Sequence, residues 1–212
     1  MLAELLARVD HLIYAGPDLD EAVARVESLI GIRATAGGSH PGEGTRNALL
    51  ALGPSSYLEI LGPDPEQPAP QRPRWFRVDE LSAPRLVAWA AKSPDLERIA
   101  ASASPGAARL GRVLAGSRRR PDGVMLSWWL TDPRAVSEGG VIPFLIDWGS
   151  SPHPAAGAAP GATLIDLRAE HPEPETAAAA LRALGIAPPV VKGPAAGLVA
   201  RVDCPKGVVE LR

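Results

Sequence analysis

The chain has 212 residues, of which 46% are hydrophobic and 22% are charged, and its formal net charge is −2. These are the proportions of an ordinary soluble globular protein. The near-neutral charge argues against a nucleic-acid-binding protein, which normally carries a basic excess. Nothing approaches 18 consecutive apolar residues, so we expect neither a membrane span nor a membrane partner.

The opening segment and the cysteine content indicate the compartment. The segment MLAELLARVD carries Glu4 and Arg8 within its apolar run and lacks a basic leader, so it is not typical of a signal peptide. The single cysteine, Cys204, excludes an internal disulfide. Its setting, Cys-Pro-Lys-Gly, favours a turn between strands over a nucleophile. We therefore expect a cytoplasmic protein.

Two proline clusters divide the chain. The first, PDPEQPAPQRP, spans 63–73, and the second, SSPHPAAGAAPGA, spans 150–162. Neither accommodates a long helix or a central strand. The predicted organisation is a first module at 1–62, a proline-rich linker at 63–83, a second module at 84–149, a Pro/Ala/Gly linker at 150–161 and a third module at 162–212.

The first segment is predicted to contain one helix and four strands. Apolar residues recur at three- and four-residue spacings from Leu19 to Ile30, which predicts a helix over 19–29 with Asp18 as its N-cap. The strands are predicted at 9–15, 33–37, 48–52 and 57–61.

The other two segments repeat this order of elements. Each joint between a first strand and its helix carries a proline followed by an acidic residue: Pro17-Asp18, Pro94-Asp95 and Pro172-Glu173. The second segment is predicted as a strand at 85–91, a short helix within 93–103, and strands at 111–115, 124–131 and 141–146. The third is predicted as a strand at 163–169, a helix at 173–184, and strands at 190–192, 198–202 and 207–211.

Each segment is therefore predicted to be one β-α-β-β-β unit, used three times. A four-stranded sheet with a helix on one face leaves its other face to be covered. Pairing two such sheets makes a cleft that is lined by side chains from both.

The repeat, the opening DHLIYAGPDLDEA and the run YLEIL that ends the first module resemble the vicinal oxygen chelate superfamily. The run GGSHPGEGTRNALLALGPSSYLEILG and the later PFLIDWG resemble its glyoxalase-like domain family. The resemblance implies an α+β fold of repeated βαβββ modules, three in this chain, paired around a cleft that binds a metal in most enzymes of the superfamily. Its members include lyases, isomerases, ring-cleaving dioxygenases and metal-free sequestering proteins, so the activity does not follow from the fold.

The resemblance also implies where a metal would bind. Superfamily enzymes take one ligand from the first strand and one from the last strand of each paired module, and His11 and Glu59 match those positions in the first module. An imidazole and a carboxylate suit Zn, Mn, Fe, Ni or Co, with open positions for a bidentate substrate. Such an ion acts as a Lewis acid on vicinal oxygens.

The second ligand pair depends on which modules face each other. In the second module the matching positions hold Ala88 and Ile146, and neither side chain ligates a metal. In the third module they hold Asp166 and Glu210. If the first and third modules face each other, the complete ligand set is His11, Glu59, Asp166 and Glu210.

Pairing of the first module with the second is the arrangement that we favour, because the two are neighbours in sequence. His11 and Glu59 then need a further donor from His40, His153 or Asp147. In the alternative without a metal, His11 is a hydrogen-bonded cleft histidine and Glu59 pairs with an arginine.

Further residues are candidates for substrate contacts. The polar loop SHPGEGTRN places His40 at a cleft edge and directs Arg46 and Asn47 at a substrate carboxylate or carbonyl, although a plain loop is the alternative. His153 is a further candidate. The loop lacks the G-x-x-x-x-G-K-S/T form and no helix opens after it, so we do not expect a phosphate cradle.

Tryptophans and a basic hairpin complete the candidate site. Trp128 and Trp129 are adjacent on one strand and so point to opposite faces, with Trp128 expected in the cleft. Trp148 is expected to line the same cavity, although core packing also explains such tryptophans. The basic run at 117–123 is either a solvated edge or a gate for an anionic substrate.

Three hypotheses about function remain open. The leading one is a metal-dependent lyase, isomerase or dioxygenase that acts on a small oxygenated molecule, with Glu59 and Glu210 as catalytic carboxylates whose pKa is raised by burial. The second is a binding protein that sequesters a planar or aromatic small molecule without chemistry. The third concerns assembly: an odd number of modules leaves one sheet face to pair with a second chain in a homodimer.

Overall fold

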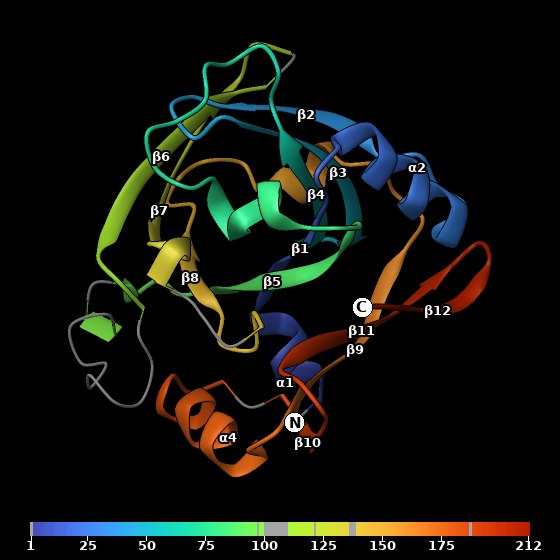
Figure 1. Cartoon of the computed structure of the whole chain (residues 1–212), viewed down its shortest axis with the longest axis vertical. Helices are drawn as coiled ribbons and strands as arrows, with labels where there is room; N and C mark the ends of the chain where they lie inside the picture. The colour runs from blue at the N-terminus through green and yellow to red at the C-terminus, as the bar shows by residue number, and fades with distance from the viewer. Residues whose placement is uncertain (1, 97, 100–109, 121, 136–138, 187) are drawn as a thin grey trace.

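The computed structural model describes residues 2–96, 98–99, 110–120, 122–135, 139–186 and 188–212. The strands of this described part form an eight-stranded sheet, in the order β2-β3-β4-β1-β5-β8-β7-β6, and a four-stranded sheet, in the order β10-β9-β11-β12 (Figure 1). The edge strands β2 and β6 of the larger sheet lie close to each other, so this sheet is nearly closed on itself.

The first module contributes half of the large sheet. It comprises β1 (Val9–Ala15), α2 (Leu19–Ile30), β2 (Thr35–His40), β3 (Thr45–Gly53) and β4 (Ser56–Pro63). As predicted, Asp18 caps α2, because its side chain accepts a hydrogen bond of 2.8 Å from the backbone N–H of Glu21. β1 pairs in parallel with β4, so the first and last strands of the module are neighbours.

The second module repeats this pairing. It comprises β5 (Arg85–Lys92), β6 (Val113–Arg119), β7 (Met125–Thr131) and β8 (Phe144–Asp147), with β5 parallel to β8. Within the helix expected at 93–103, Leu96, Arg98 and Ile99 are helical, and residues 97 and 100–103 lie outside the described ranges. β1 and β5 pair antiparallel and join the two modules, which confirms that the first module pairs with the second.

The third segment has the predicted order of elements with a different pairing of strands. It comprises β9 (Thr163–His171), α4 (Pro174–Ala183), β10 (Val190–Lys192), β11 (Gly197–Cys204) and β12 (Gly207–Leu211). Its first strand pairs with its second and third strands, whereas in the other modules the first strand pairs with the fourth. The segment therefore does not present the curved face that the first two modules share.

Four short helices were not predicted: α1 (Leu2–Arg8) and the 3₁₀ helices η1 (Trp75–Glu80), η2 (Pro133–Ala135) and η3 (Pro154–Gly157). Two of them, η1 and η3, lie in the stretches expected to be linkers, since a short 3₁₀ helix needs no long helical pattern. None of the helices in the described ranges is long and apolar enough to cross a membrane.

Hydrophobic packing occupies both faces of the large sheet. On the outer face, Val9, Leu12 and Tyr14 of β1 belong to a core that also contains residues of α2, α4, β9 and β11. On the inner face, Ile13 and Ala15 pack with residues of β5, β7, β8 and η1. The third segment thus covers the outside of the sheet, and the inside is left to form a pocket.

Close packing of α2 on β4 gives a testable consequence at Gly62. A Cβ at this position would lie 2.7–2.8 Å from the N, Cα and Cβ atoms of Leu19. Two of these are backbone atoms, which cannot move without shifting α2. We expect Gly62→Ala to lower the free energy of unfolding by about 1–3 kcal/mol, as other overpacked sites do.

Urea-induced unfolding measures this difference. The matched control is Gly197→Ala on β11, where an added Cβ meets nothing within 4 Å, and we expect a change within about 0.5 kcal/mol. Equal unfolding free energies for the two variants would contradict the assigned contact between α2 and β4.

Candidate functional site

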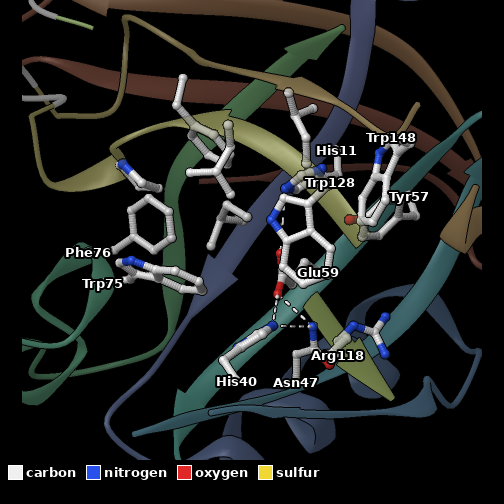
Figure 2. Close-up of a pocket in the computed structure, with 15 residues that line it drawn as sticks. His11, His40, Asn47, Tyr57, Glu59, Trp75, Phe76, Arg118, Trp128 and Trp148 are labelled. Carbon is white, nitrogen blue, oxygen red and sulfur yellow. Dashed lines mark hydrogen bonds and ion pairs between the residues drawn. The ribbon is translucent and has the colours of Figure 1, made fainter. Parts of the chain in front are cut away.

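A pocket lies on the inner face of the large sheet, and both modules line it. Its volume is about 40 Å³, against the roughly 10–15 Å³ that one water molecule requires, so it suits a small group. The lining residues are His11, Ile13, His40, Asn47, Tyr57, Glu59, Trp75, Phe76, Arg118, Trp128, Leu130, Pro133, Phe144, Ile146 and Trp148 (Figure 2).

Glu59 on β4 is the centre of the polar side of this pocket. The residue is only 8% exposed, and its Oε1 accepts a hydrogen bond of 2.6 Å from Asn47 Nδ2. His11 Nε2 lies 3.5 Å from Oε2, and His40 Nε2 lies 3.6 Å from Oε1. Figure 2 shows His40 and Asn47 directed at the Glu59 carboxylate. The carboxylate therefore lies between two imidazoles, with one amide holding it in place.

His40 is held as a neutral imidazole. Burial lowers its pKa, and this effect outweighs the attraction of the Glu59 carboxylate, so the ring stays uncharged at neutral pH. Its Nδ1 lies 3.0 Å from Thr45 Oγ1 and its Nε2 lies 3.3 Å from Asn47 Nδ2. Since the Asn47 amide donates, Nε2 accepts, and the ring proton is on Nδ1.

His11 is oriented by its sequence neighbour, Asp10. The pairing of β1 with β5 shifts register between Val9 and His11, so the strand bulges at Asp10. The bulge brings the Asp10 carboxylate 2.7 Å from His11 Nδ1, although adjacent residues of a regular strand point to opposite faces. With Nδ1–H donated to Asp10, the Nε2 atom of His11 is directed towards Glu59.

The Asp10 carboxylate is fully buried and receives donors from distant parts of the chain. Trp148 Nε1 lies 3.1 Å from Oδ1, and His153 Nε2 lies 3.2 Å from Oδ2. Burial by itself raises the pKa of Asp10. The hydrogen bonds from His11 and His153 lower it by more than burial raises it, so the pKa is well below its usual range. Asp10 is therefore an ionised anchor for His11.

Arg118 adds a buried positive charge to the pocket. It is the second residue of the basic hairpin, and its Nη1 donates a hydrogen bond of 2.9 Å to the backbone carbonyl of Gly37. Its neighbour Arg119 is exposed, because successive side chains of β6 alternate between faces. One residue of the basic run thus lines the pocket, and the next is solvated.

The rest of the pocket wall is apolar and aromatic. Trp128 and Trp148 lie 5.2 Å apart between ring centroids, and Phe144 contacts His11 edge-on at 5.5 Å. Trp75 and Phe76 of η1 close another side, with Phe76 lying 5.9 Å from Phe144. Such a wall favours a ligand with a planar or apolar body.

The structure gathers most of the sequence-predicted residues. His11, His40, Asn47, Glu59, Trp128 and Trp148 all line the pocket, and Trp129 is 53% exposed on the opposite face of β7. His153 contacts the site through Asp10. Asp147, the other candidate donor, accepts a hydrogen bond from the Gly149 backbone and does not line the pocket.

Arg46 does not reach the pocket. It alternates with Asn47 along β3 and therefore points to the outer face, where its Nη2 lies 3.4 Å from Asp20 Oδ2. The expectation that Arg46 and Asn47 meet one substrate group is wrong for this reason.

Asp166 and Glu210 also lie apart from His11 and Glu59. They belong to the four-stranded sheet, where Arg168 pairs with Glu210 at 2.9 Å and with Asp166 at 3.7 Å. Glu210 is exposed to solvent, and its hydrogen bond to Arg168 lowers its pKa, opposite to the rise expected from burial. The four-ligand set with His11 and Glu59 is therefore not formed, because the third segment packs on the outside of the sheet.

The donor set of the pocket does not match a four-ligand metal site. In the second module, Ala90 lies opposite His11 in register, and Phe144 and Ile146 occupy β8 where a ligand is needed. Across the ranges that the structure describes, no group of three or more His, Cys, Asp or Glu side chains is arranged to hold a metal ion. The potential donors, His11, His40 and Glu59, all come from the first module.

Three residues of the site, Asp10, Trp75 and Phe76, are not indicated by the sequence pattern. Asp10 was hidden because strand alternation predicts that it faces away from His11, and no sequence signal marked the bulge. Trp75 and Phe76 lay in a stretch interpreted as a linker. The sequence feature that could have indicated their burial is the pair of adjacent aromatic residues in an otherwise polar, proline-rich stretch.

The fold and the sequence were compared with those of known proteins. A hypothetical protein from Staphylococcus aureus aligns with a TM-score of 0.64 and 12% identity, covering 89% of this chain and 87% of that chain, a likeness of fold alone. A variant of Streptomyces coelicolor methylmalonyl-CoA epimerase aligns with a TM-score of 0.44 and 22% identity, covering 68% and 96%. The Mycobacterium tuberculosis epimerase aligns with a TM-score of 0.45 and 22% identity, covering 72% and 93%. Comparison with curated proteins gives no match.

The sequence itself matches a family model. The model, described as a glyoxalase-like domain, covers residues 9–185, which include both paired modules and the whole pocket. Together with the paired βαβββ modules, this match confirms the resemblance to the vicinal oxygen chelate superfamily. The chain belongs to the glyoxalase-like domain family.

Proposed function

We propose that the protein is an enzyme that transfers a proton on a small oxygenated substrate, in an isomerase- or lyase-type reaction. The observation that carries the proposal is the Glu59 carboxylate, buried in a pocket between two modules and flanked by His11 and His40. A buried carboxylate beside an oriented imidazole is a pair suited to general acid–base catalysis.

The two sides of the pocket support one class of substrate. Arg118 supplies a buried guanidinium for a carboxylate or for charge that develops on a carbonyl oxygen. Trp128 and Phe144 supply an apolar surface for the rest of the molecule. A small oxo acid with an apolar body meets both requirements.

In the proposed reaction Glu59 is the base. Its Oε1 is held by Asn47, which leaves Oε2 to take a proton from the carbon beside the substrate carbonyl. The C–H electron pair forms a C=C bond to the carbonyl carbon, and the π pair of the carbonyl moves to its oxygen. The resulting enolate oxygen is stabilised electrostatically by Arg118. His11, whose Nε2 is 3.5 Å from Oε2, exchanges the proton with Glu59, and Asp10 fixes the ring for this transfer.

No step of this proposal passes through a metal. His11, His40 and Glu59 are the donors that a divalent ion would find in the pocket, and the second module offers apolar side chains where further ligands are needed. A metal-dependent lyase, isomerase or dioxygenase reaction is the alternative to acid–base catalysis. Measurements with EDTA and with added metal ions distinguish the two.

A non-catalytic binding protein is the second candidate. The aromatic wall favours it, because Trp128, Trp148 and the two aromatic residues of η1 enclose a planar ligand whether or not chemistry follows. In that case a ligand quenches tryptophan fluorescence while its carbon-bound protons remain unexchanged.

Proton transfer predicts exchange of substrate hydrogen with solvent. The probes are 2-oxobutyrate and phenylpyruvate in D₂O, with deuterium incorporation at C3 followed by NMR. We expect the protein to accelerate exchange of at least one probe, and Glu59→Gln to reduce the rate by about 100-fold or more, since positioned acid–base groups contribute about 10²–10⁴-fold.

The matched control is Glu175→Gln, an exposed carboxylate on α4, which should leave the exchange rate unchanged. Each measurement is repeated with EDTA and with added Mn²⁺ or Zn²⁺. Quenching without exchange would favour the sequestering protein, and exchange that requires an added ion would replace acid–base catalysis by the metal-assisted route.

The buried, ionised Asp10 predicts a specific pH dependence of stability. Because its pKa in the folded protein lies below the roughly 3.9 of an unfolded chain, its contribution is complete above that pH and is lost as pH falls further. Asp10→Asn removes this contribution. We therefore expect the gap in unfolding free energy between wild type and Asp10→Asn to narrow between pH 4 and pH 3, by at most about 1.4 kcal/mol.

Urea unfolding at pH 5, 4 and 3 tests this expectation. The control is Asp203→Asn, an exposed position on β11. The unfolding free energies of wild type and this variant should differ by no more than about 0.5 kcal/mol at every pH. A gap for Asp10→Asn that stays constant or widens towards pH 3 would show that the carboxylate is not held ionised.

A further inference from the structure

A second cavity adjoins the Glu59 pocket. Its volume is about 420 Å³, and it shares two lining residues, Phe76 and Pro133, with the pocket. Arginines dominate its charged lining, and no acidic side chain is among the described residues that line it. The lining comprises Pro73, Arg74, Phe76, Arg77, Arg85, Val87, Ala88, Pro133, Arg134, Gly139 and Gly140.

Three of the four arginines have acidic partners outside the cavity lining. Arg74 Nη1 lies 2.7 Å from Asp79, Arg77 Nη1 lies 2.8 Å from Glu80, and Arg134 pairs with Glu43. These pairs hold the guanidinium groups in place. The partner carboxylates are not among the described residues that line the cavity, so its lining carries charged groups of positive sign.

Two of the arginines have guanidinium N–H donors without a hydrogen-bond partner in the described structure. Arg85, at the start of β5, is exposed, and no hydrogen bond or ion pair of its side chain is found in the described structure. Arg134 Nη1 is buried without a hydrogen-bond partner there, since the Asp132 carboxylate oxygen is 3.8 Å away. A buried, unpaired donor of this kind costs stability unless a ligand or water satisfies it.

The boundary between the two cavities is strained. Phe76 and Arg77 both have left-handed backbone, with φ of 54° and 51°, and they are the non-glycine residues with positive φ in the described part of the chain. Such conformations persist when surrounding contacts demand them and are concentrated at ligand-binding segments. Here the strain places the Phe76 ring against the pocket and the Arg77 side chain at the arginine cavity.

We propose that the arginine cavity binds a phosphate or diphosphate group. A single carboxylate is satisfied by one forked guanidinium, whereas four arginines around one cavity match an oxyanion with several charges and more acceptor oxygens. The phosphate is the far end of a molecule whose reactive end passes Phe76 and enters the pocket at Glu59. This second statement rests on the proposed function, while phosphate binding itself does not.

Isothermal titration with inorganic pyrophosphate, at low ionic strength and without any substrate, tests the site. The variants are Arg85→Gln, which disturbs no described partner, and Arg134→Gln, which removes the buried unpaired donor. The control, Arg201→Gln on the exposed side of β11, removes the same charge from the four-stranded sheet. Succinate is the carboxylate probe.

We expect pyrophosphate to bind wild type and Arg201→Gln equally, each cavity variant to weaken binding by about tenfold or more, and succinate to bind at least tenfold more weakly. No pyrophosphate binding, equal loss in Arg201→Gln, or succinate binding as tight as pyrophosphate would each overturn the proposal. Because the titration uses no reaction, its failure leaves the proton-exchange result unaffected, and failure of proton exchange leaves the phosphate site unaffected.

Discussion

The antiparallel pairing of β1 with β5 is the contact on which the rest of the structure depends. It joins two four-stranded sheets into one, and the alternation of side chains along β1 then divides the molecule into an outer and an inner face. The outer face packs under the helices and the third segment, and the inner face becomes the wall of the pocket. The same pairing contains the bulge at Asp10, so the joint between the modules also shapes the site.

Two buried carboxylates impose the next constraint. Removing an ion from water costs several kcal/mol even after relaxation, so Asp10 and Glu59 require donors. Asp10 receives them from His11, Trp148 and His153, and Glu59 receives one from Asn47. Trp148 lies just before the second linker and His153 lies within it. Their hydrogen bonds to Asp10 therefore attach this stretch to the first strand.

The two modules share a fold and differ in chemistry. The first provides the carboxylate and both imidazoles, whereas the second provides the apolar side chains of Trp128, Phe144 and Ile146. A buried guanidinium, Arg118, is the polar contribution of the second module to the lining. This division gives one end of a bound molecule a polar environment and the other an apolar one, which is the basis for the proposed oxo-acid chemistry.

Local patterns determined much of this protein. Helical spacing and the Asp18 cap define α2, and strand patterns predict β1, β10 and β12 with their observed bounds, because these features depend on neighbouring residues. The matched positions of His11 and Glu59 also placed both on the inner face. Tertiary structure alone decided the strand pairing of the third segment, which removes Asp166 and Glu210 from the site. It also decided the bulge that turns Asp10 towards His11 and the fold of η1 that brings Trp75 and Phe76 to the pocket. These outcomes depend on contacts between residues far apart in the chain, which a local pattern does not encode.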